Sequence, residues 1–354
     1  MIILDRYIAR HVALGTLLVM GLLLALFTVF SFMDELNRVG KGNYTTSHAI
    51  QYVLLLLPGL AYQLFPIAAL LGSTIGLGMM ASNSELTSMR AAGISLNRIV
   101  WSIMKVGLML VALTLILGES ITPVAEQYAR TLRSVAISDK LAIRGKSQLW
   151  ARDGNSVVNV RTILPGERLG GIFIYERDAS HKISRIVQAE SAVFNNDQWM
   201  LEGVVSSDLA SKQVISRRQD KLIWDTNLSP DLLSVVTLHP TTMSIRGLYQ
   251  YVSYLKKNGL DAATYEYALW GKIIAPLVTG VMVFLAIPFV FGPLRSVGVG
   301  HRVLVGALVG IGFYLANQMF AYVGIVFSFN PVLSALIPAG LALVVAYWMM
   351  RRVR

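Results

Sequence analysis

Long apolar stretches without formal charge constrain this chain more than any other feature. No Asp, Glu, Lys or Arg occurs between Arg10 and Asp34, and about 20 apolar residues suffice for a helix to cross a bilayer. Five further largely apolar segments follow, at about 49–81, 98–120, 269–291, 303–327 and 331–350. The sequence therefore predicts six membrane helices, three on each side of a more polar middle part.

Local composition adds detail to these spans. Pro58 and Pro66 lie inside the second span and predict a kinked or broken helix. Small residues recur every four positions at Ala68, Gly72 and Gly76, a spacing that allows another helix to approach closely.

The middle part, residues 122–267, is predicted to be one β-domain. Short runs rich in Val, Ile, Phe and Trp lie at 156–164, 171–175, 183–194, 199–208, 213–218 and 222–225, and turn residues separate them. Many short strands without intervening helices favour a sandwich or jellyroll. Residues 243–259 predict a helix that ends at Asn258-Gly259. The expected fold is an α-helical polytopic membrane protein, with halves at 1–121 and 268–354 and an inserted all-β, jellyroll-like domain.

Basic residues in the short loops predict the orientation, because Lys and Arg concentrate on the cytoplasmic side. One side carries only Arg38 and Lys41, whereas the other carries Arg6, Arg10, Arg90, Arg98, Arg295, Arg302, Arg351, Arg352 and Arg354. Both termini are therefore expected in the cytoplasm, with 122–267 on the far side. This distribution also explains the net charge of +11 better than nucleic-acid binding does. Residues 2–11 predict a short interfacial helix with Asp5 in water.

The loop between spans two and three predicts a short capped helix over about 83–92. Ser82 and Glu85 have the spacing of a capping box, and Gly93 is placed for a left-handed C-terminal cap. One face of this helix carries Leu86, Met89 and Arg90. Such a helix fits a groove on a cytoplasmic partner or rests on lipid as a plain connector, and spacing alone favours neither.

Ionisable residues inside spans are costly and point to specific partners. Glu119 and Lys272 lie near the outer ends of spans three and four, and we expect them to pair. Lys105 lies in the inner half of span three, and we expect its side chain to extend to the cytoplasmic surface.

No pattern in the sequence indicates an enzyme or a cofactor. Gly145-Lys146-Ser147 resembles the end of a nucleotide-binding loop, but Lys140 stands where that loop requires glycine. The five histidines are scattered, and the chain contains no cysteine. A secondary transporter is disfavoured, because no acidic or histidine relay lies mid-span. A structural anchor for a β-domain stays open as an alternative.

Seven short runs, spread over nearly the whole chain, carry a resemblance to a known family. The runs are Leu4–Ile8, Phe65–Gly72, Ser84–Gly93, Trp150–Gly154, Ser244–Leu248, Phe291–Ser296 and Gly300–Arg302. In this order they resemble the lipopolysaccharide export permeases of the LptF/LptG family, and they are nearer to the G-type subunit than to its F-type paralogue.

The resemblance implies a transport function and a set of partners. Members pair as an F/G heterodimer around a lipid cavity, above two copies of the ATPase LptB, which hydrolyses ATP in their place. They extract lipopolysaccharide from the inner membrane of Gram-negative bacteria. Their β-jellyroll passes the lipid to LptC and then to the periplasmic LptA bridge, toward the outer membrane.

The resemblance also implies roles for particular residues. The short helix corresponds to the family's coupling helix, with Glu85, Leu86, Met89 and Arg90 at the ATPase contact. Arg38 and Lys41 would meet the phosphates of the head group, unless they only anchor the helix end at the interface. Better-known members carry further lysines there, where this chain has Ser31 and Asn37.

Overall fold

Six long helices dominate the structure, a computed structural model that describes residues 2–137, 149–164, 168–178, 182–195, 198–209, 214–226, 228, 240–291, 298–327 and 329–352. In this part of the chain, six helical stretches are long and apolar enough to cross a membrane. The three-plus-three layout is therefore confirmed. The helices are α1 (Ile2–Leu36), α2 (Thr46–Ser82), α4 (Leu96–Ile116), α8 (Ala263–Phe291), α9 (Val299–Val326) and α10 (Pro331–Arg352).

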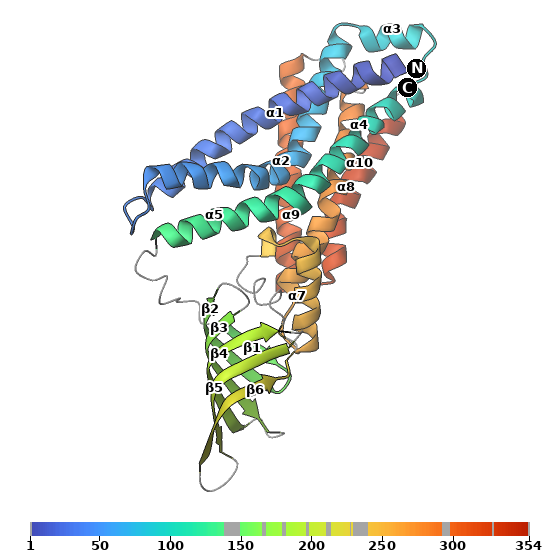
Figure 1. The fold of residues 1–354 in the computed structure, drawn as a ribbon. Helices are drawn as coiled ribbons and strands as arrows, with labels where there is room; N and C mark the ends of the chain where they lie inside the picture. The colour runs from blue at the N-terminus through green and yellow to red at the C-terminus, as the bar shows by residue number, and fades with distance from the viewer. Residues whose placement is uncertain are drawn as a thin grey trace.

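The two ends of the bundle differ in what they carry. Both chain termini lie at one end, beside the short helix α3 (Glu85–Ala91), and the sheet lies beyond the opposite end (Figure 1). We call these the termini end and the sheet end. α2 is unbroken although Pro58 and Pro66 lie inside it, and it changes direction along its length (Figure 1).

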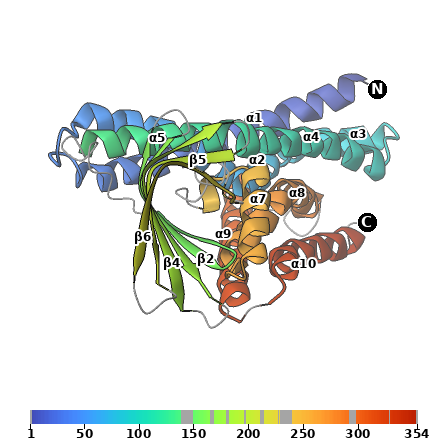
Figure 2. The ribbon, with the colours of Figure 1, turned by 60° about the horizontal axis from the view of Figure 1, so that its bottom comes forward.

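The third span is much longer than hydropathy suggests. α4 continues without a break through a π-helical turn, η1 (Leu117–Ile121), into α5 (Thr122–Ile137). The whole stretch, Leu96–Ile137, has 42 residues, so the domain boundary expected at residue 121 falls inside it. Glu126, Arg130 and Arg133 make α5 polar on one side, which is why its composition resembles that of the middle domain. α5 packs on α2 and extends sideways with the ends of α1 and α2 (Figures 1 and 2).

The inserted domain is a single antiparallel sheet in the part of the chain that the structure describes. Its six strands pair in sequence order and curve strongly (Figure 2). The inserted all-β domain is thus confirmed, but β1 was not predicted, and two predicted strands, 213–218 and 222–225, merge into β6. The strands are β1 (Leu149–Asp153), β2 (Ser156–Leu164), β3 (Arg168–Arg177), β4 (Ile183–Asn195), β5 (Gln198–Asp208) and β6 (Ile215–Trp224).

One helix joins the sheet to the bundle. After the short 3-10 turn η2 (Pro240–Thr242), α7 (Ile245–Lys257) packs Leu248, Tyr251 and Leu255 into the core of the sheet. Leu269 of α8 belongs to the same core. The β-domain, meaning β1–β6 with α7, therefore shares its hydrophobic core with a membrane helix.

Small residues let α1 and α2 cross in close contact. A Cβ on Gly72 would lie 2.2 Å from the Cα of Thr16, and one on Gly76 would lie 2.4 Å from the carbonyl oxygen of His11. No side chain fits at these positions, so the spacing of Gly72 and Gly76 serves helix packing as expected. Gly15 of α1 is equally close to α2.

Candidate functional site

The N-terminus of α3 differs from the predicted one. Ser82 still belongs to α2, and the N-cap of α3 is Ser84, whose φ of +59° is left-handed. No side chain accepts a hydrogen bond at this cap. The capping box predicted at Ser82 is therefore wrong, because α2 runs on to that residue and only Asn83 and Ser84 separate it from α3.

The C-terminus of α3 follows the prediction. Gly93 has a φ of +85°, and its N–H donates to the carbonyl of Arg90 at 3.0 Å. The N–H of Ile94 donates to the carbonyl of Met89 at 3.1 Å. These two bonds form a Schellman motif, which needs a left-handed residue at the position of Gly93.

The apolar residues of α3 face the bundle of this chain. Leu86 is only 4% exposed and packs with Ile8 of α1, Ile99 of α4 and Val290 of α8. Met89 is partly buried against the same core. The apolar part of the predicted docking face thus anchors α3 to three membrane helices.

The polar residues of α3 lie at its surface. The hydroxyl of Tyr7 in α1 donates to Oε2 of Glu85 at 3.0 Å, which joins α3 to the first membrane helix. The side chain of Arg90 is exposed and has no polar partner in the described part of the chain. Beside it, a groove of about 370 Å³ opens between α3 and the end of α8, where Val290 and Phe291 lie.

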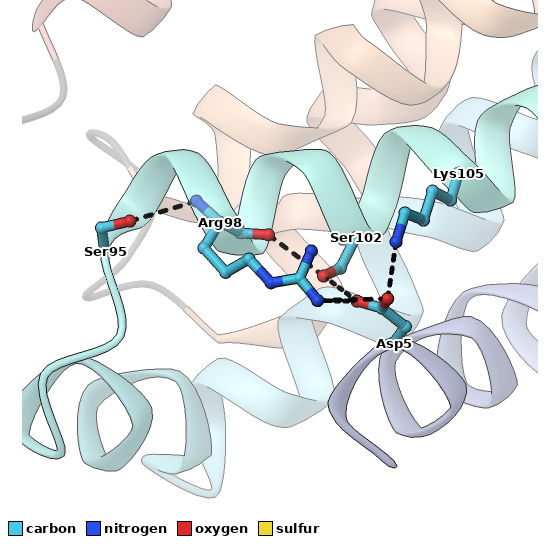
Figure 3. Close-up of polar contacts among 5 residues, drawn as sticks. All are labelled: Asp5, Ser95, Arg98, Ser102 and Lys105. Carbon is cyan, nitrogen blue, oxygen red and sulfur yellow. Dashed lines mark hydrogen bonds and ion pairs between the residues drawn. The ribbon is translucent and has the colours of Figure 1, made fainter. Parts of the chain in front are cut away.

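An ionic cluster fixes α1 to α4 next to α3 (Figure 3). The carboxylate of Asp5 accepts hydrogen bonds from Nη2 of Arg98 at 3.0 and 3.2 Å, from the hydroxyl of Ser102, and from Nζ of Lys105 at 2.7 Å. Ser95 caps α4 by accepting from the N–H of Arg98. Two cations and a hydroxyl on one helix thus hold a carboxylate on another.

The course of α1 and this cluster correct three expectations. Residues 2–11 are not a separate interfacial helix, because α1 runs unbroken from Ile2. Asp5 does not simply face water: its side chain is 22% exposed and ion-paired. Lys105 pairs with Asp5 instead of only extending to the membrane surface.

Arg302 was counted on sequence grounds only as a loop charge, but it is 3% exposed. Its Nη1 donates to the carbonyl of Gly78 at 3.0 Å. Gly78 lies four residues before Ser82, the last residue of α2, and its carbonyl also accepts from the hydroxyl of Ser82 at 2.9 Å. Arg302 therefore ties α9 to the last turn of α2, seven residues before α3 begins.

The predicted head-group residues lie at the far end of α1. Arg38 is half exposed and pairs with Glu35 at 3.6 Å, while Lys41 is exposed. Glu35 itself is 5% exposed and accepts from the Tyr44 hydroxyl at 2.9 Å. Burial and the neighbouring Glu35 carboxylate raise the pKa of Tyr44 well above its usual range, so its hydroxyl remains a donor.

Two further arginines from α5 approach this region. Arg133 lies 3.5 Å from Glu35 and stacks on the ring of Tyr52 at 4.5 Å. Arg130, one turn earlier, lies 3.9 Å from Glu126. The prediction missed both arginines because it assigned 122–137 to the β-domain. The spacing of Glu126 and Arg130, four residues apart, is a signal for a surface helix.

Glu119 and Lys272, which we expected to pair, are not joined by a direct ion pair. The Glu119 carboxylate accepts the N–H of Ile245 through both oxygens, at 3.1 and 2.9 Å. Nζ of Lys272 donates to the carbonyl of Met243. The two side chains therefore hold the same short segment at the start of α7.

Several predicted features lie outside the described residues. These are Gly145-Lys146-Ser147, the run from Gly292 to Ser296 with Arg295, the histidines His181 and His239, and Arg354.

Comparison with known proteins gives a consistent result over the whole chain. A family model described as lipopolysaccharide export system permease LptF/LptG matches residues 6–352. The lipopolysaccharide export system permease protein LptG of Escherichia coli K12 is 38% identical over 353 residues, which cover 99% of this chain and 98% of that protein. LptG of Haemophilus influenzae is 37% identical over 353 residues, 99% of both chains.

Proposed function

This chain belongs to the LptF/LptG family of lipopolysaccharide export permeases, and from that membership we propose how its parts divide the work. It is a multi-pass inner-membrane permease and not itself an enzyme. In our proposal it is one half of an ABC transporter whose other half is LptF and whose ATP is hydrolysed by an LptB dimer. The extracted lipid then passes to LptC and the LptA bridge.

We propose that the termini end faces the cytoplasm and that the β-domain lies in the periplasm. Arg6, Arg10, Arg90, Arg98 and Arg302 all belong to the termini end, which supports this orientation through the tendency of basic residues to stay in the cytoplasm.

The construction of α3 is the observation that carries the proposal for ATPase coupling. A helix of seven residues is too short to be stable alone, yet Leu86 anchors it in a core shared by α1, α4 and α8. Its outer side presents Arg90, which has no polar partner among the described residues, and a groove of about 370 Å³. A partner that binds there would push on three membrane helices at once.

The proposed movement reaches α1 through two polar links. Glu85 binds Tyr7, and Asp5 binds Arg98 and Lys105, so α1, α3 and α4 are expected to move together. α1 also presents a row of exposed leucines, which are Leu14, Leu17, Leu18, Leu22 and Leu26. An apolar face of this kind suits the wall of a cavity that holds acyl chains and is completed by a second subunit.

We further propose that Arg38 and Lys41 meet the head-group phosphates, with Arg130 and Arg133 beside them. Guanidinium groups bind phosphate through paired, charge-assisted hydrogen bonds. Glu35 holds Arg38 and Arg133 in place but also neutralises part of their charge. Arg130 is likewise paired with Glu126. Lys41, for which the described residues provide no ion pair, is therefore expected to contribute most to binding.

Reconstitution tests the coupling proposal. The chain is co-expressed with its F-type partner, the ATPase and LptC, and Arg90→Ala is compared with Lys257→Ala, an exposed basic residue on α7 far from α3. We expect Arg90→Ala to weaken ATPase binding and ATP-dependent lipid extraction in liposomes, and Lys257→Ala to change neither. Full extraction with Arg90→Ala, or extraction that follows a proton gradient without the ATPase, would contradict the proposal.

A further inference from the structure

The chain at 243–245, where α7 begins, is held from the membrane side by the α4–α5 helix and by α8, and α2 contacts α8 at the same point. Glu119 lies in the π-helical turn between α4 and α5, and its carboxylate accepts the N–H of Ile245. Lys272 of α8 is 7% exposed and donates to the carbonyl of Met243. The hydroxyl of Tyr62 in α2 donates in turn to the carbonyl of Lys272 at 3.4 Å.

The π-helical turn is closely packed at this point. A Cβ on Gly118 would lie 2.4 Å from Cε2 of Tyr62, so a larger residue at this position would displace the Tyr62 ring. π-helical turns are rare and occur often at functional positions. Here the turn sits at the junction of α4 with α5, and it brings the Glu119 carboxylate against α7.

The charges on the two side chains match the groups that they hold. The first N–H groups of a helix lack partners within the helix and carry partial positive charge. Ser244 accepts the N–H of Gly247 at 3.1 Å, and Glu119 satisfies the N–H of Ile245. Lys272 supplies the positive charge on the carbonyl side. Loss of either side chain leaves a partly buried polar group without its partner.

The opposite side of α7 is part of the β-domain. Leu248, Tyr251 and Leu255 pack in the core of the sheet with residues such as Trp199 and Leu201. A displacement of the first turn of α7 must therefore move the sheet as well, because a packed core does not deform freely.

We propose that Glu119 and Lys272 are positioning residues for the transfer of lipid from the membrane bundle to the β-domain. Their hydrogen bonds hold the start of α7. A rearrangement of α2, α4–α5 and α8 therefore moves α7, and the sheet turns together with α7. Lys272 and Tyr62 also border a cavity of about 320 Å³ between α2, α5, α8, α9 and α10. A change in that cavity thus reaches α7 through the same residues. This inference rests on the proposed function.

The test measures movement and transfer in the same reconstituted complex. This chain contains no cysteine, so its spin labels can be placed at Tyr322→Cys on α9, which is not among the helices proposed to move with α7, and at Lys221→Cys on β6, both at exposed positions. The distance between them is measured with and without a trapped nucleotide. Transfer is measured as ATP-dependent photocrosslinking of lipopolysaccharide to the β-domain, alongside ATP turnover.

We expect Glu119→Ala and Lys272→Met each to abolish the nucleotide-dependent distance change. Transfer should fall about tenfold, as for loss of one hydrogen bond to a charged group, while ATP turnover stays at the parent level. Lys272→Arg, which keeps a charged donor, should restore transfer. Glu266→Gln, which breaks the pair with Lys256 at the other end of α7, is the matched control and should behave like the parent.

A full distance change with normal transfer in both variants would overturn the inference. If Glu119→Ala does not assemble, Glu119→Gln decides, because it keeps the size and one acceptor oxygen but removes the charge, and transfer at the parent level would then refute the proposed role. Failure of the proposed function is distinct, since the parent complex itself would then show no ATP-dependent transfer.

Discussion

Replacing Leu86 by alanine tests whether the packing of one side chain holds α3 to the membrane bundle. The side chain is 4% exposed and contacts a core shared with α1, α4 and α8. The helix has only seven residues, so its own hydrogen bonds cannot keep it folded. Detachment of α3 should therefore follow closely from the loss of this contact.

The expected magnitude follows from the burial of the side chain. Leu→Ala substitutions at buried positions cost about 2–5 kcal/mol, the lower part of this range applying where the site can relax. α3 lies at the end of the bundle and Met89 can shift into the space, so we expect about 2–3 kcal/mol. At ~1.4 kcal/mol per factor of ten, the detached state becomes roughly 30 to 140 times more populated.

Hydrogen exchange of the backbone amides of 85–94 measures this population directly. Exchange should accelerate by the same factor where opening is fast and reversible, and ATP turnover should lose its coupling to lipid extraction. Leu108→Ala is the control, because Leu108 on α4 is 70% exposed. Unchanged exchange in Leu86→Ala would mean that α3 is held by other contacts, and the argument for force transmission through Leu86 would fail.

Three further substitutions test other parts of the structure. Tyr7→Phe removes the hydroxyl that donates to Glu85, so ATPase binding should persist while the lipid extracted per ATP falls, as a paired binding and extraction assay would reveal. Gly15→Ala places a Cβ 2.3 Å from a carbonyl oxygen of α2, which should cost about 1–3 kcal/mol of stability; Gly21→Ala, with nothing within 4 Å, should melt like the parent. Trp199→Phe deprives a buried carbonyl of its 2.6 Å hydrogen bond and should destabilise the chain by about 1–3 kcal/mol in denaturant titrations, whereas equal midpoints would show that this bond contributes nothing.

The features predicted well are those that local chemistry determines. A bilayer requires a minimum length of apolar helix, so the spans follow from the absence of charge. β2 has the predicted bounds, Ser156–Leu164, because a run of β-branched residues is followed in the sequence by Pro165-Gly166, which disfavours continuing a strand. β6 was split in two because its middle, Arg217–Lys221, is polar, and the structure leaves that strand largely exposed.

The features predicted poorly depend on residues far apart in the sequence. Asp5 was expected to face water on a short interfacial helix, but its partners lie 93 to 100 residues later in α4. Glu119 and Lys272 were paired by opposite charge, whereas Glu119 accepts the N–H of Ile245 in α7 and Lys272 donates to the carbonyl of Met243, just before α7. Every residue except proline has the same backbone donor and acceptor, so the sequence does not show which backbone groups a charged side chain will bind. Another side chain of opposite charge is then the only partner that the sequence suggests.

The helix that runs without a break from Leu96 to Ile137 is long enough to turn a small tilt at one end into a larger movement at the other. Its 42 residues extend over about 63 Å at ~1.5 Å per residue, roughly twice the ~30 Å thickness of the hydrocarbon core. About half of its length therefore exceeds what a perpendicular crossing of that core requires. The end near Arg133 is held to α1 and α2 by the pair of Arg133 with Glu35 and by the packing of α5 on α2. A tilt of the helix by about 10° would move that end, together with the ends of α1 and α2, by roughly 5 Å. A small rotation of this helix at the termini end can in this way displace its opposite end by a distance comparable to the size of a phosphate group.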